Sequence, residues 1–514
     1  MRPLPRAEQA LRSGDLAQAE RLLRRVLLTE PRNSRAHELL AYVLGNRGDL
    51  EGLHRHLESA TQQPGATPGA WYYLGVYWQK KLEHERAVAC FENALSLDPH
   101  SFEASFDLGV SLDALKRHDA ALASYERAIA SNPNSPEAWT NRGAALLDLG
   151  RHDEALASFE RAIGISPAHP EAWSGCGVTL HYLRRHAEAL AAFERALEIR
   201  PGDPRTLWRK FFTHATVGDL EKAWPLFEQR WNRDDAEPMR HAKIAAWDGR
   251  APLAGARVLA WSEAGFGDTL QFCRYASLLQ SRGAQVVLEV QSALRSLLAS
   301  SFPDCIVIEA GSEAPRCEHA VALMSLPFKL ETTLATIPAS VPYLHVENER
   351  VEAWRARLGA PNDRIRAGVA CSGSPSTRLD ARRSVALETL APLGRCADLF
   401  LIQKQVREQD AAWLARNASV VRDLSQELGD FHDAAAAIEC MDVVITVDTA
   451  LAHLAGALGK ATWVLLGWES EWRWLLERED SPWYPTMRLF RQQRGESWSG
   501  VVRRVESALC AWRR

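Results

Sequence analysis

A carboxylate beside two glycines is the first feature of this sequence that could do chemistry. The segment SEAGFGDTLQ, residues 262–271, places Asp268 just after Gly265 and Gly267, between an apolar run and a helical pattern. Glycine lets a substrate approach the backbone closely, and a carboxylate in such a turn can take a proton from an attacking hydroxyl. Asp268 could equally do no more than cap the helix that follows. The roles of general base and helix cap are both open.

A second candidate site lies in residues 443–474. Val443 to Val447 is a β-branched apolar run that predicts a buried strand, and a helix is expected to start at Asp448-Thr449. Another apolar run begins at Thr462. A helix N-terminus at the carboxyl edge of a parallel sheet suits a phosphate group. The simpler alternative is an ordinary strand–helix–strand unit in which His453 is a satisfied core histidine.

Two polar segments could supply further ligand contacts. The segment CSGSPSTRLDARRS, residues 371–384, contains Gly373 and Arg383, and Gln403-Lys404 follows the predicted strand Leu399 to Ile402. Positive charge at these places favours a diphosphate leaving group. The alternatives are a solvated surface loop and an exposed lysine.

The elements that precede these candidates repeat with a period of 34 residues, the tetratricopeptide value. Such a period predicts helix pairs that stack into a superhelix and bury their apolar faces on one another. Prolines in five of the repeats are expected to end the second helix, because proline cannot continue one. In the last repeat Phe211 replaces glycine and Arg230 a small residue, as capping or docking onto a following domain would require. The recurring positions are Ala19, Leu53, Ala87, Ala121, Ala155, Ala189 and Ala223; Leu23, Leu57, Phe91, Tyr125, Phe159, Phe193 and Phe227; Gly75, Gly109, Gly143 and Gly177; and Pro31, Pro99, Pro133, Pro167 and Pro201.

The second half alternates strands with helices, which predicts parallel doubly wound sheets. The expected strands are 258–261, 286–290, 305–308 and 319–324 in a first lobe, and 365–370, 399–402, 420–421, 443–447 and 462–466 in a second. The predicted organisation is an all-α repeat superhelix over 1–235, a linker over 236–255, and two Rossmann-like α/β lobes over 256–345 and 346–514.

The segment VDTALAHLAGALGK, residues 447–460, resembles the donor-binding signature of glycosyltransferases with the two-lobed GT-B fold, in the branch that contains the lipopolysaccharide heptosyltransferases. The combination with tetratricopeptide repeats is similar to bacterial flagellin-modifying transferases and, more distantly, to the O-GlcNAc transferases. The resemblance implies an inverting, metal-independent transfer from a nucleotide sugar, with the active site between an acceptor-side first lobe and a donor-side second lobe. No cofactor is implied, because the nucleotide sugar is a substrate.

Residue by residue, the resemblance assigns Asp268 as the catalytic base. Thr377 stands where relatives have a histidine and Leu379 where they have an asparagine, so altered specificity, weaker activity or none is open. The expected donor-binding residues are Gly265, Gly267, Gly373, Gln403, Lys404, Asp448, Thr449, Ala450 and His453, and the expected further substrate contacts are Glu263, Arg383, Glu469, Trp472 and Arg473.

Composition narrows the class of protein. The net charge of −4 with mixed signs gives no basic footprint for nucleic acid. No apolar stretch approaches the roughly 20 residues of a membrane span, and the first residues lack the apolar core of a secretory signal. Nine cysteines without a CxxC pair indicate neither a zinc site nor a disulfide framework. A cytoplasmic protein is expected, with peripheral association at the inner membrane face left open.

Three functions fit these features. The first is a glycosyltransferase whose repeats present a protein acceptor such as flagellin or another surface protein. The second is a non-catalytic scaffold with a degenerate transferase domain, which the departures at Thr377 and Leu379 favour. The third is a lipopolysaccharide or capsule glycosyltransferase that its repeats dock onto an assembly complex. A partner protein or peptide is expected on the repeats in each case, and a homodimer is compatible with all three.

Overall fold

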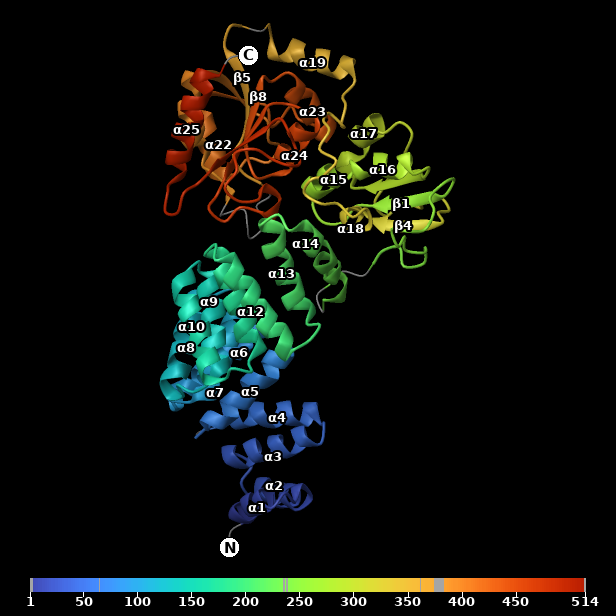
Figure 1. Cartoon of the computed structure of the whole chain (residues 1–514). Coiled ribbons are helices and arrows are strands. Elements are labelled where there is room, and N and C mark those ends of the chain that lie inside the picture. Colours follow the sequence, from blue (N-terminus) through green and yellow to red (C-terminus); the bar gives the residue numbers. More distant parts are fainter. Residues whose placement is uncertain are drawn as a thin grey trace. The chain divides into compact units, whose positions relative to one another are not determined.

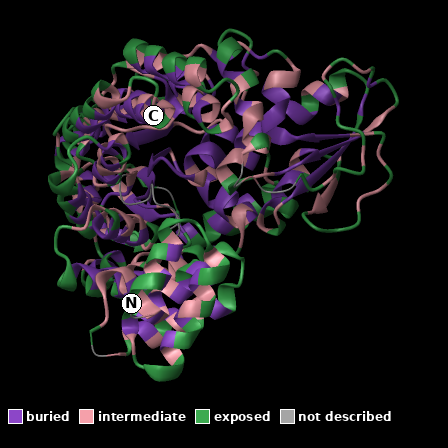
Figure 2. Cartoon of the chain, turned by 90° about the horizontal axis from the view of Figure 1, so that it is seen from below, coloured by how far each residue is buried: buried purple, intermediate pink, exposed green. Residues whose placement is uncertain are grey.

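The chain forms two compact units, Met1–Thr206 and Leu207–Arg514. The computed structural model describes residues 3–63, 65–233, 236, 239–360, 362–373 and 383–512 (Figure 1). Most strand residues of the second unit are buried, apart from those of β3 and β7, whereas exposed residues gather on outer helix faces and loops (Figure 2).

The first unit is an all-α tetratricopeptide superhelix, as the 34-residue period predicts. Its helices follow one another in antiparallel pairs, and each pair packs on the next. The helices are α1 (Pro3–Arg12), α2 (Leu16–Thr29), α3 (Ser34–Asn46), α4 (Leu50–Thr61), α5 (Pro68–Lys80), α6 (His84–Leu97), α7 (Phe102–Ala114), α8 (His118–Ser131), α9 (Pro136–Asp148), α10 (His152–Ile165), α11 (Pro170–Tyr182) and α12 (His186–Ile199).

Glycine and a large ring form the contact inside each of the central repeats. A Cβ added to Gly143 would lie 2.8 Å from Cζ of Phe159, and one added to Gly177 would lie 2.6 Å from Cε1 of Phe193. Real Cβ atoms do not approach this closely, so only glycine lets the first helix rest on the ring of the second. Gly75 and Gly109 meet Phe91 and Tyr125 in the same way.

Helix ends in the repeats follow the capping chemistry of the sequence. The hydroxyl of Ser101 accepts the N–H of Ala104 at 3.2 Å, and the hydroxyl of Ser135 accepts that of Ala138 at 3.2 Å. Pro136 and Pro170 occupy the first turns of α9 and α11, where a backbone N–H has no helical partner. The prolines predicted to end second helices do follow those helices by two residues.

The seventh helix pair, α13 (Pro204–Thr216) and α14 (Leu220–Phe227), belongs mostly to the second unit. Phe211, which stands at the position of the repeat glycine, is fully buried and packs 4.9 Å from the ring of Phe227. Trp224 of α14 donates its indole N–H to the carbonyl of Thr332 at 2.8 Å. The irregular last repeat therefore docks onto the α/β part of the chain and shares its hydrophobic core.

A first parallel sheet has the strand order β3-β2-β1-β4. Residue pairs such as Arg257↔Gln285 and Val258↔His319 set the register of β1 against β2 and β4. The elements are β1 (Arg257–Trp261), α15 (Phe266–Phe272), α16 (Tyr275–Ser281), β2 (Gln285–Val290), α17 (Ser292–Ser301), β3 (Ile306–Glu309), β4 (His319–Ala322), η2 (Leu323–Ser325) and α18 (Leu326–Lys329), with η1 (Glu228–Asn232) ahead of them.

The second parallel sheet has the order β10-β9-β8-β5-β6-β7. Numbered along its own chain segment this is 6-5-4-1-2-3, the order of the doubly wound nucleotide-binding sheet, which reverses direction between β5 and β8. Strand β10 was not predicted. The elements are α19 (Asn348–Leu358), β5 (Ile365–Ala370), α21 (Leu387–Leu390), η3 (Ala391–Arg395), β6 (Ala397–Leu401), α22 (Glu408–Arg416), β7 (Val421–Asp423), α23 (Phe431–Glu439), β8 (Val443–Val447), α24 (Ala450–Ala457), β9 (Thr462–Leu466), η4 (Trp472–Trp474), β10 (Met487–Arg491) and α25 (Trp498–Ala511).

Two connections differ in character from the sequence expectation. Within the segment predicted as a linker, residues 245–247 lie along β4 at the edge of the first sheet, where the N–H of Trp247 donates to the carbonyl of Ala320 at 2.9 Å. The cysteine pattern indicated no disulfide framework, yet Cys396 and Cys510 form a disulfide across 114 residues of sequence. It joins η3 to the C-terminal helix α25.

Candidate functional site

The turn after β1 is held in an unusual backbone conformation. Ala264 has a φ of +60°, in the left-handed region that non-glycine residues rarely adopt. Gln291, which follows β2, braces this turn: its Nε2 donates to the carbonyl of Ala264 at 3.2 Å, and its Oε1 accepts the hydroxyl of Thr269 at 2.9 Å. A strained residue of this kind persists where its surroundings fix it, and such residues cluster at functional sites.

Asp268 lies in the first turn of α15 and caps it. Its Oδ2 accepts the N–H of Gly265 at 3.0 Å, while its Oδ1 forms an ion pair with Nη2 of Arg473 from the second lobe. The side chain is half-buried. Helix capping and a role in chemistry are therefore compatible, because a carboxylate has about four lone-pair directions and these two bonds use two.

Arg473 connects the two lobes beneath this carboxylate. Besides Asp268, its guanidinium binds Oε1 of Gln271 through Nε at 2.7 Å and Oε2 of Glu471 through Nη1 at 2.7 Å. The neighbouring carboxylates of Asp268, Glu471 and Asp448 outweigh the effect of burial and raise the pKa of Arg473. Arg473 therefore remains a cation at the place where α15 of the first lobe meets the second lobe.

The second sheet places Asp448 and Thr449 at the carboxyl end of β8, beside its switch point. The hydroxyl of Thr449 accepts the N–H of Leu451 at 3.3 Å and lies 3.3 Å from the hydroxyl of Thr446. Both Asp448 and Thr449 are buried. Ala450 opens α24, so this end of the helix faces the first lobe across Gly267.

Several charged groups influence Asp448 and its neighbours. Burial raises the pKa of Asp448, and Trp474, Arg383 and Arg473 oppose this effect. Burial likewise raises the pKa of Glu471, against the attraction of Arg473. On the first lobe, burial raises the pKa of Glu263, which is bound by Arg230 of η1 at 2.9 and 2.8 Å. The site thus gathers buried carboxylates around a few guanidinium groups.

His453 lies one turn into α24 and is 5% exposed. Its Nδ1 lies 2.9 Å from the hydroxyl of Tyr484, and its ring stacks on Trp474 with centroids 5.4 Å apart. Burial and then the nearby cation Arg473 lower the pKa of His453 well below its usual value. The imidazole is therefore neutral at pH 7 and can exchange hydrogen bonds without carrying charge.

The two lobes meet closely at these residues. A Cβ added to Gly267 would lie 3.0 Å from Cδ2 of His453 and 3.6 Å from the Cα of Ala450. The rings of Phe266 and Phe431 lie 5.0 Å apart, and the hydroxyl of Ser296 donates to Asp430 at 2.9 Å. Helices α15 and α24, nearly 200 residues apart in sequence, thus pack against each other.

Other predicted donor residues lie beside the switch point but serve the protein itself. Gln403 accepts the N–H groups of Cys371 at 2.7 Å and Ser372 at 3.2 Å, and its Nε2 donates to Ser372 and to the carbonyl of Gln405. Exposed Lys404 donates to the carbonyl of Gly429. The bonds of Gln403 shape the turn after β5, and that of Lys404 ties the end of β6 to the segment before α23.

The remaining residues predicted to contact the donor or another substrate differ in burial. Trp472 is buried, while Glu469, Gly373 and Arg383 are half-buried. Arg383 influences the pKa of Asp448, so it lies within electrostatic reach. The positions of Thr377 and Leu379 lie outside the described residues.

Sequence reasoning missed several residues of this centre. Gln271 could have been found, because it lies three residues after Asp268 and so on the same face of α15. Glu471 is only two residues from Arg473. Arg230 was marked only as a departure from the repeat pattern, not as a partner of Glu263. The contacts of Tyr484 and Trp474 with His453 could not be predicted, because these residues come together only in the tertiary fold.

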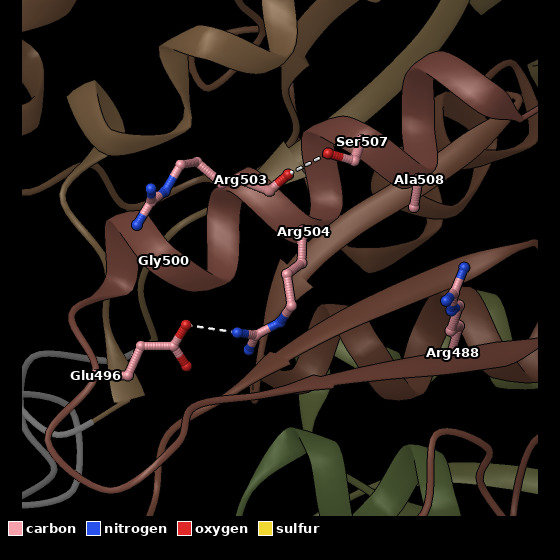
Figure 3. A pocket seen from close by; sticks show the side chains of 7 residues that line it. All are labelled: Arg488, Glu496, Gly500, Arg503, Arg504, Ser507 and Ala508. Carbon is pink, nitrogen blue, oxygen red and sulfur yellow. Dashed lines mark hydrogen bonds and ion pairs between the residues drawn. The ribbon is translucent and has the colours of Figure 1, made fainter.

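Surface hollows lie apart from this centre. One of about 640 Å³ between β10 and α25 is lined by Arg488, Glu496, Gly500, Arg503, Arg504, Ser507 and Ala508 (Figure 3). Arg504 there is paired with Glu496 at 2.5 Å. A smaller one of about 100 Å³ at the ends of β1 and β4 is lined by Trp231, Trp261, His241 and Lys329 among others. The predicted site residues line neither hollow.

The tetratricopeptide repeat family matches residues 4–52, 79–136, 117–170 and 140–204. The N-terminal region is a tetratricopeptide repeat array. Protein FlbA of Caulobacter vibrioides is 24% identical over 337 residues, which make up 60% of this chain and 56% of FlbA. The chain therefore spans little more than half the length of that curated relative.

Solved structures of repeat proteins are also similar. The structure of YrrB, described as a TPR protein with an unusual peptide-binding site, is 25% identical, covers 36% of this chain and 95% of its own, and has a TM-score of 0.34. MamA from Desulfovibrio magneticus is 22% identical, covers 33% of this chain and 97% of its own, and has a TM-score of 0.31.

Two features are absent from the described residues. Among them no helix has the length and apolar character needed to cross a bilayer. Within the same residues, no three histidine, cysteine, aspartate or glutamate side chains are grouped so that they could hold a metal ion.

Proposed function

We propose that this protein is a glycosyltransferase of the two-lobed GT-B type, which moves a sugar from a nucleotide sugar to a protein acceptor. The observation that carries the proposal is the meeting of two sheet edges. Asp268 follows β1, and Asp448, Thr449 and His453 follow β8, so residues from the carboxyl ends of two parallel sheets face one another. Open α/β sheets bind ligands outside this edge, at the point where the strand order reverses.

The proposed chemistry is a single inverting displacement. The acceptor hydroxyl gives its proton to a carboxylate oxygen of Asp268 as its oxygen forms a bond to the anomeric carbon. The bond from that carbon to the phosphate oxygen breaks, and the nucleoside diphosphate leaves with the electron pair. Cationic Arg383 and the N-terminus of α24 stabilise the negative charge that develops there. No step needs a metal ion or another cofactor.

The repeats supply the acceptor in this proposal. A tetratricopeptide superhelix offers an extended surface that suits a peptide segment. The resemblance of the sequence to flagellin-modifying enzymes makes flagellin or another surface protein the first acceptor to test.

A non-catalytic scaffold is the second candidate, and particular contacts favour it. The polar groups of Gln403 and Lys404 form hydrogen bonds with the protein's own backbone, and Asp268 forms an ion pair with Arg473. In a scaffold these residues would be only structural, and the repeats would still bind their partner.

Nucleotide binding is the first test. The full chain is screened by thermal shift against UDP, GDP, CMP and ADP compounds. A ligand at a hundredfold excess over its Kd stabilises the folded state by about 2.7 kcal/mol. One class of nucleotide should raise the melting temperature. Thr449→Pro should remove that effect, because proline holds φ near about −65°, whereas Thr449 at the N-cap of α24 has a φ of −141°. A flat response to every nucleotide would favour the scaffold.

Transfer is the second test. The chain is incubated with the radiolabelled sugar of the nucleotide class found and with an extract of its host cells. Label should enter a protein band, and Asp268→Asn should slow this about 10²–10⁴-fold, the usual contribution of a general base, and leave a small residual rate. Label in the lipid fraction instead would indicate a lipopolysaccharide or capsule acceptor.

A further inference from the structure

Three neighbouring side chains of η4 point to three different parts of the second unit. A 3-10 helix has about 3.0 residues per turn, so consecutive side chains leave its axis about 120° apart. Trp472 packs on Phe211 and Trp224 of the last repeat, with ring centroids 5.6 Å away in each case. Arg473 reaches α15, and Trp474 stacks on His453 of α24. One turn of helix therefore fixes the position of Arg473 from both sides.

The backbone around η4 is also constrained. Leu475 and Glu477 have φ angles of +55° and +53°, which non-glycine residues rarely adopt. Trp472 and Trp474 are 3% and 0% exposed. Arg473 itself is 9% exposed and lies with its guanidinium carbon 4.6 Å from the centroid of the Trp472 ring. The segment has little freedom to move its arginine away from α15.

The guanidinium contacts one face of α15 at two places. Asp268 and Gln271 lie three residues apart, so they occupy neighbouring positions on that face. The planar fork of arginine can hold both acceptors in fixed directions, which the single ammonium of lysine cannot. Glu471 holds the other arm of the fork at 2.7 Å.

We propose that Arg473 is a positioning residue, which orients the carboxylate of Asp268 toward the acceptor hydroxyl, rather than a group that contacts the substrate. This inference rests on the proposed function. Gly265 holds one oxygen of Asp268 and Arg473 the other, so the carboxylate plane is fixed by two bonds from different lobes. The base is thereby in place only where the two lobes are closed on each other.

A double-mutant cycle in the full chain tests the proposal. The proteins are the unchanged chain, Asp268→Asn, Arg473→Lys and the double variant, assayed for transfer of radiolabelled sugar at saturating donor. Arg473→Lys should lower the rate about 100-fold, the loss expected from a displacement of about 1 Å, and change the donor Kd less than threefold. It should have no further effect on the residual rate of Asp268→Asn, because its action passes through that side chain.

Arg274 provides a matched control. It is also a buried arginine, and it binds the carbonyl groups of Trp483 and Pro338 at 2.7 and 3.1 Å and the hydroxyl of Tyr343 at 2.8 Å. Arg274→Lys should lower the rate by the same factor with Asp268 or with Asn at that position. If Arg473→Lys does not fold, Gln271→Leu is used instead. It removes the acceptor of Nε of Arg473, and its effect on the rate should depend on Asp268 in the same way.

Each contrary result has its own meaning. Equal losses from Arg473→Lys with Asp268 and with Asn would overturn the positioning role, as would a loss confined to donor affinity. Full activity of Arg473→Lys beside an inactive Asp268→Asn would overturn this inference and leave the proposed function standing. Full activity of Asp268→Asn would overturn the role of Asp268 as the base, and with it this inference, while transfer itself would stand. Absence of transfer by the unchanged chain would overturn both.

Discussion

At the scale of single residues, Gly267 limits how closely the lobes can approach. A Cβ at this position would lie 3.0 Å from His453, so Gly267→Val must push α15 away from α24. We expect a loss of about 1–3 kcal/mol in the free energy of unfolding, typical of overpacking, and a weaker thermal shift with nucleotide. Gly394→Ala is the control, because its Cβ would meet Val420 at an ordinary 3.6 Å. An unchanged nucleotide response in Gly267→Val would contradict the placement of the donor site.

The residue scale also predicts a pH effect in the repeats. Burial, then repulsion from His37 and Arg24, lowers the pKa of His56 to about 4. An unfolded histidine titrates near about 6.5, so between these values the unfolded chain binds more protons. The contribution of neutral His56 to the free energy of unfolding is present above about pH 6.5 and is lost as the pH falls toward 4. Urea unfolding should show this loss, His56→Gln should reduce it, and His100→Gln, at an exposed site, should not.

At the scale of elements, the repeat helices depend on the pairing of glycine with a ring. Gly143→Ala would place a Cβ 2.8 Å from Phe159, and we expect it to lower the free energy of unfolding by about 1–3 kcal/mol. Gly164 is the matched control, because it lies in α10 with no atom within 4 Å of an added Cβ. Gly164→Ala should stabilise the chain by about 0.5–1 kcal/mol through helix propensity. Urea unfolding followed by circular dichroism measures both, and equal signs for the two variants would refute the account.

The elements were predictable to the extent that their signals are local. The 34-residue period gives the repeat helices. A continuous β-branched run gives a strand such as β8, because a strand buried at every residue leaves such a run in the sequence. Strand β10 has the sequence MRLFR, in which two arginines interrupt the apolar residues and no residue is β-branched, so no comparable run marks it. The contacts of the repeat glycines were predictable for the same reason, since each glycine precedes its ring by the same number of residues in the sequence.

Contacts between distant elements were not predictable in this way. Asp268 and Arg473 are 205 residues apart, and both were singled out separately for chemistry rather than as a pair. Their meeting depends on how α15 and η4 are placed by two sheets and by the last repeat. The disulfide between Cys396 and Cys510 is similar, because the spacing of the two cysteines carries no mark of their proximity. Pairings of this kind come from the tertiary fold alone.

At the scale of the whole molecule, the boundary between repeats and α/β domain does not coincide with the end of the repeat pattern. Helices α13 and α14 continue that pattern but share the hydrophobic core of the second unit. Phe211 and Trp224 cover Trp472, which precedes the arginine bound to Asp268. The last helix pair is thus a structural part of the candidate site.

This arrangement predicts the outcome of two truncations. A fragment of residues 204–514 keeps α13 and α14 and should unfold in one cooperative transition, as followed by near-ultraviolet circular dichroism. A fragment of residues 239–514 leaves Trp472 uncovered and loses the bond from Trp224 to Thr332. Truncation of one buried tryptophan to alanine typically costs about 3–5 kcal/mol, and removal of α13 and α14 takes away more buried side chains than that, so the shorter fragment should melt at a much lower temperature or lack a transition. Trp224→Ala in the longer fragment should reproduce part of that loss. Equal melting temperatures for the two fragments would mean that the last helix pair is only a spacer, and that the position of Arg473 is set by the second lobe alone.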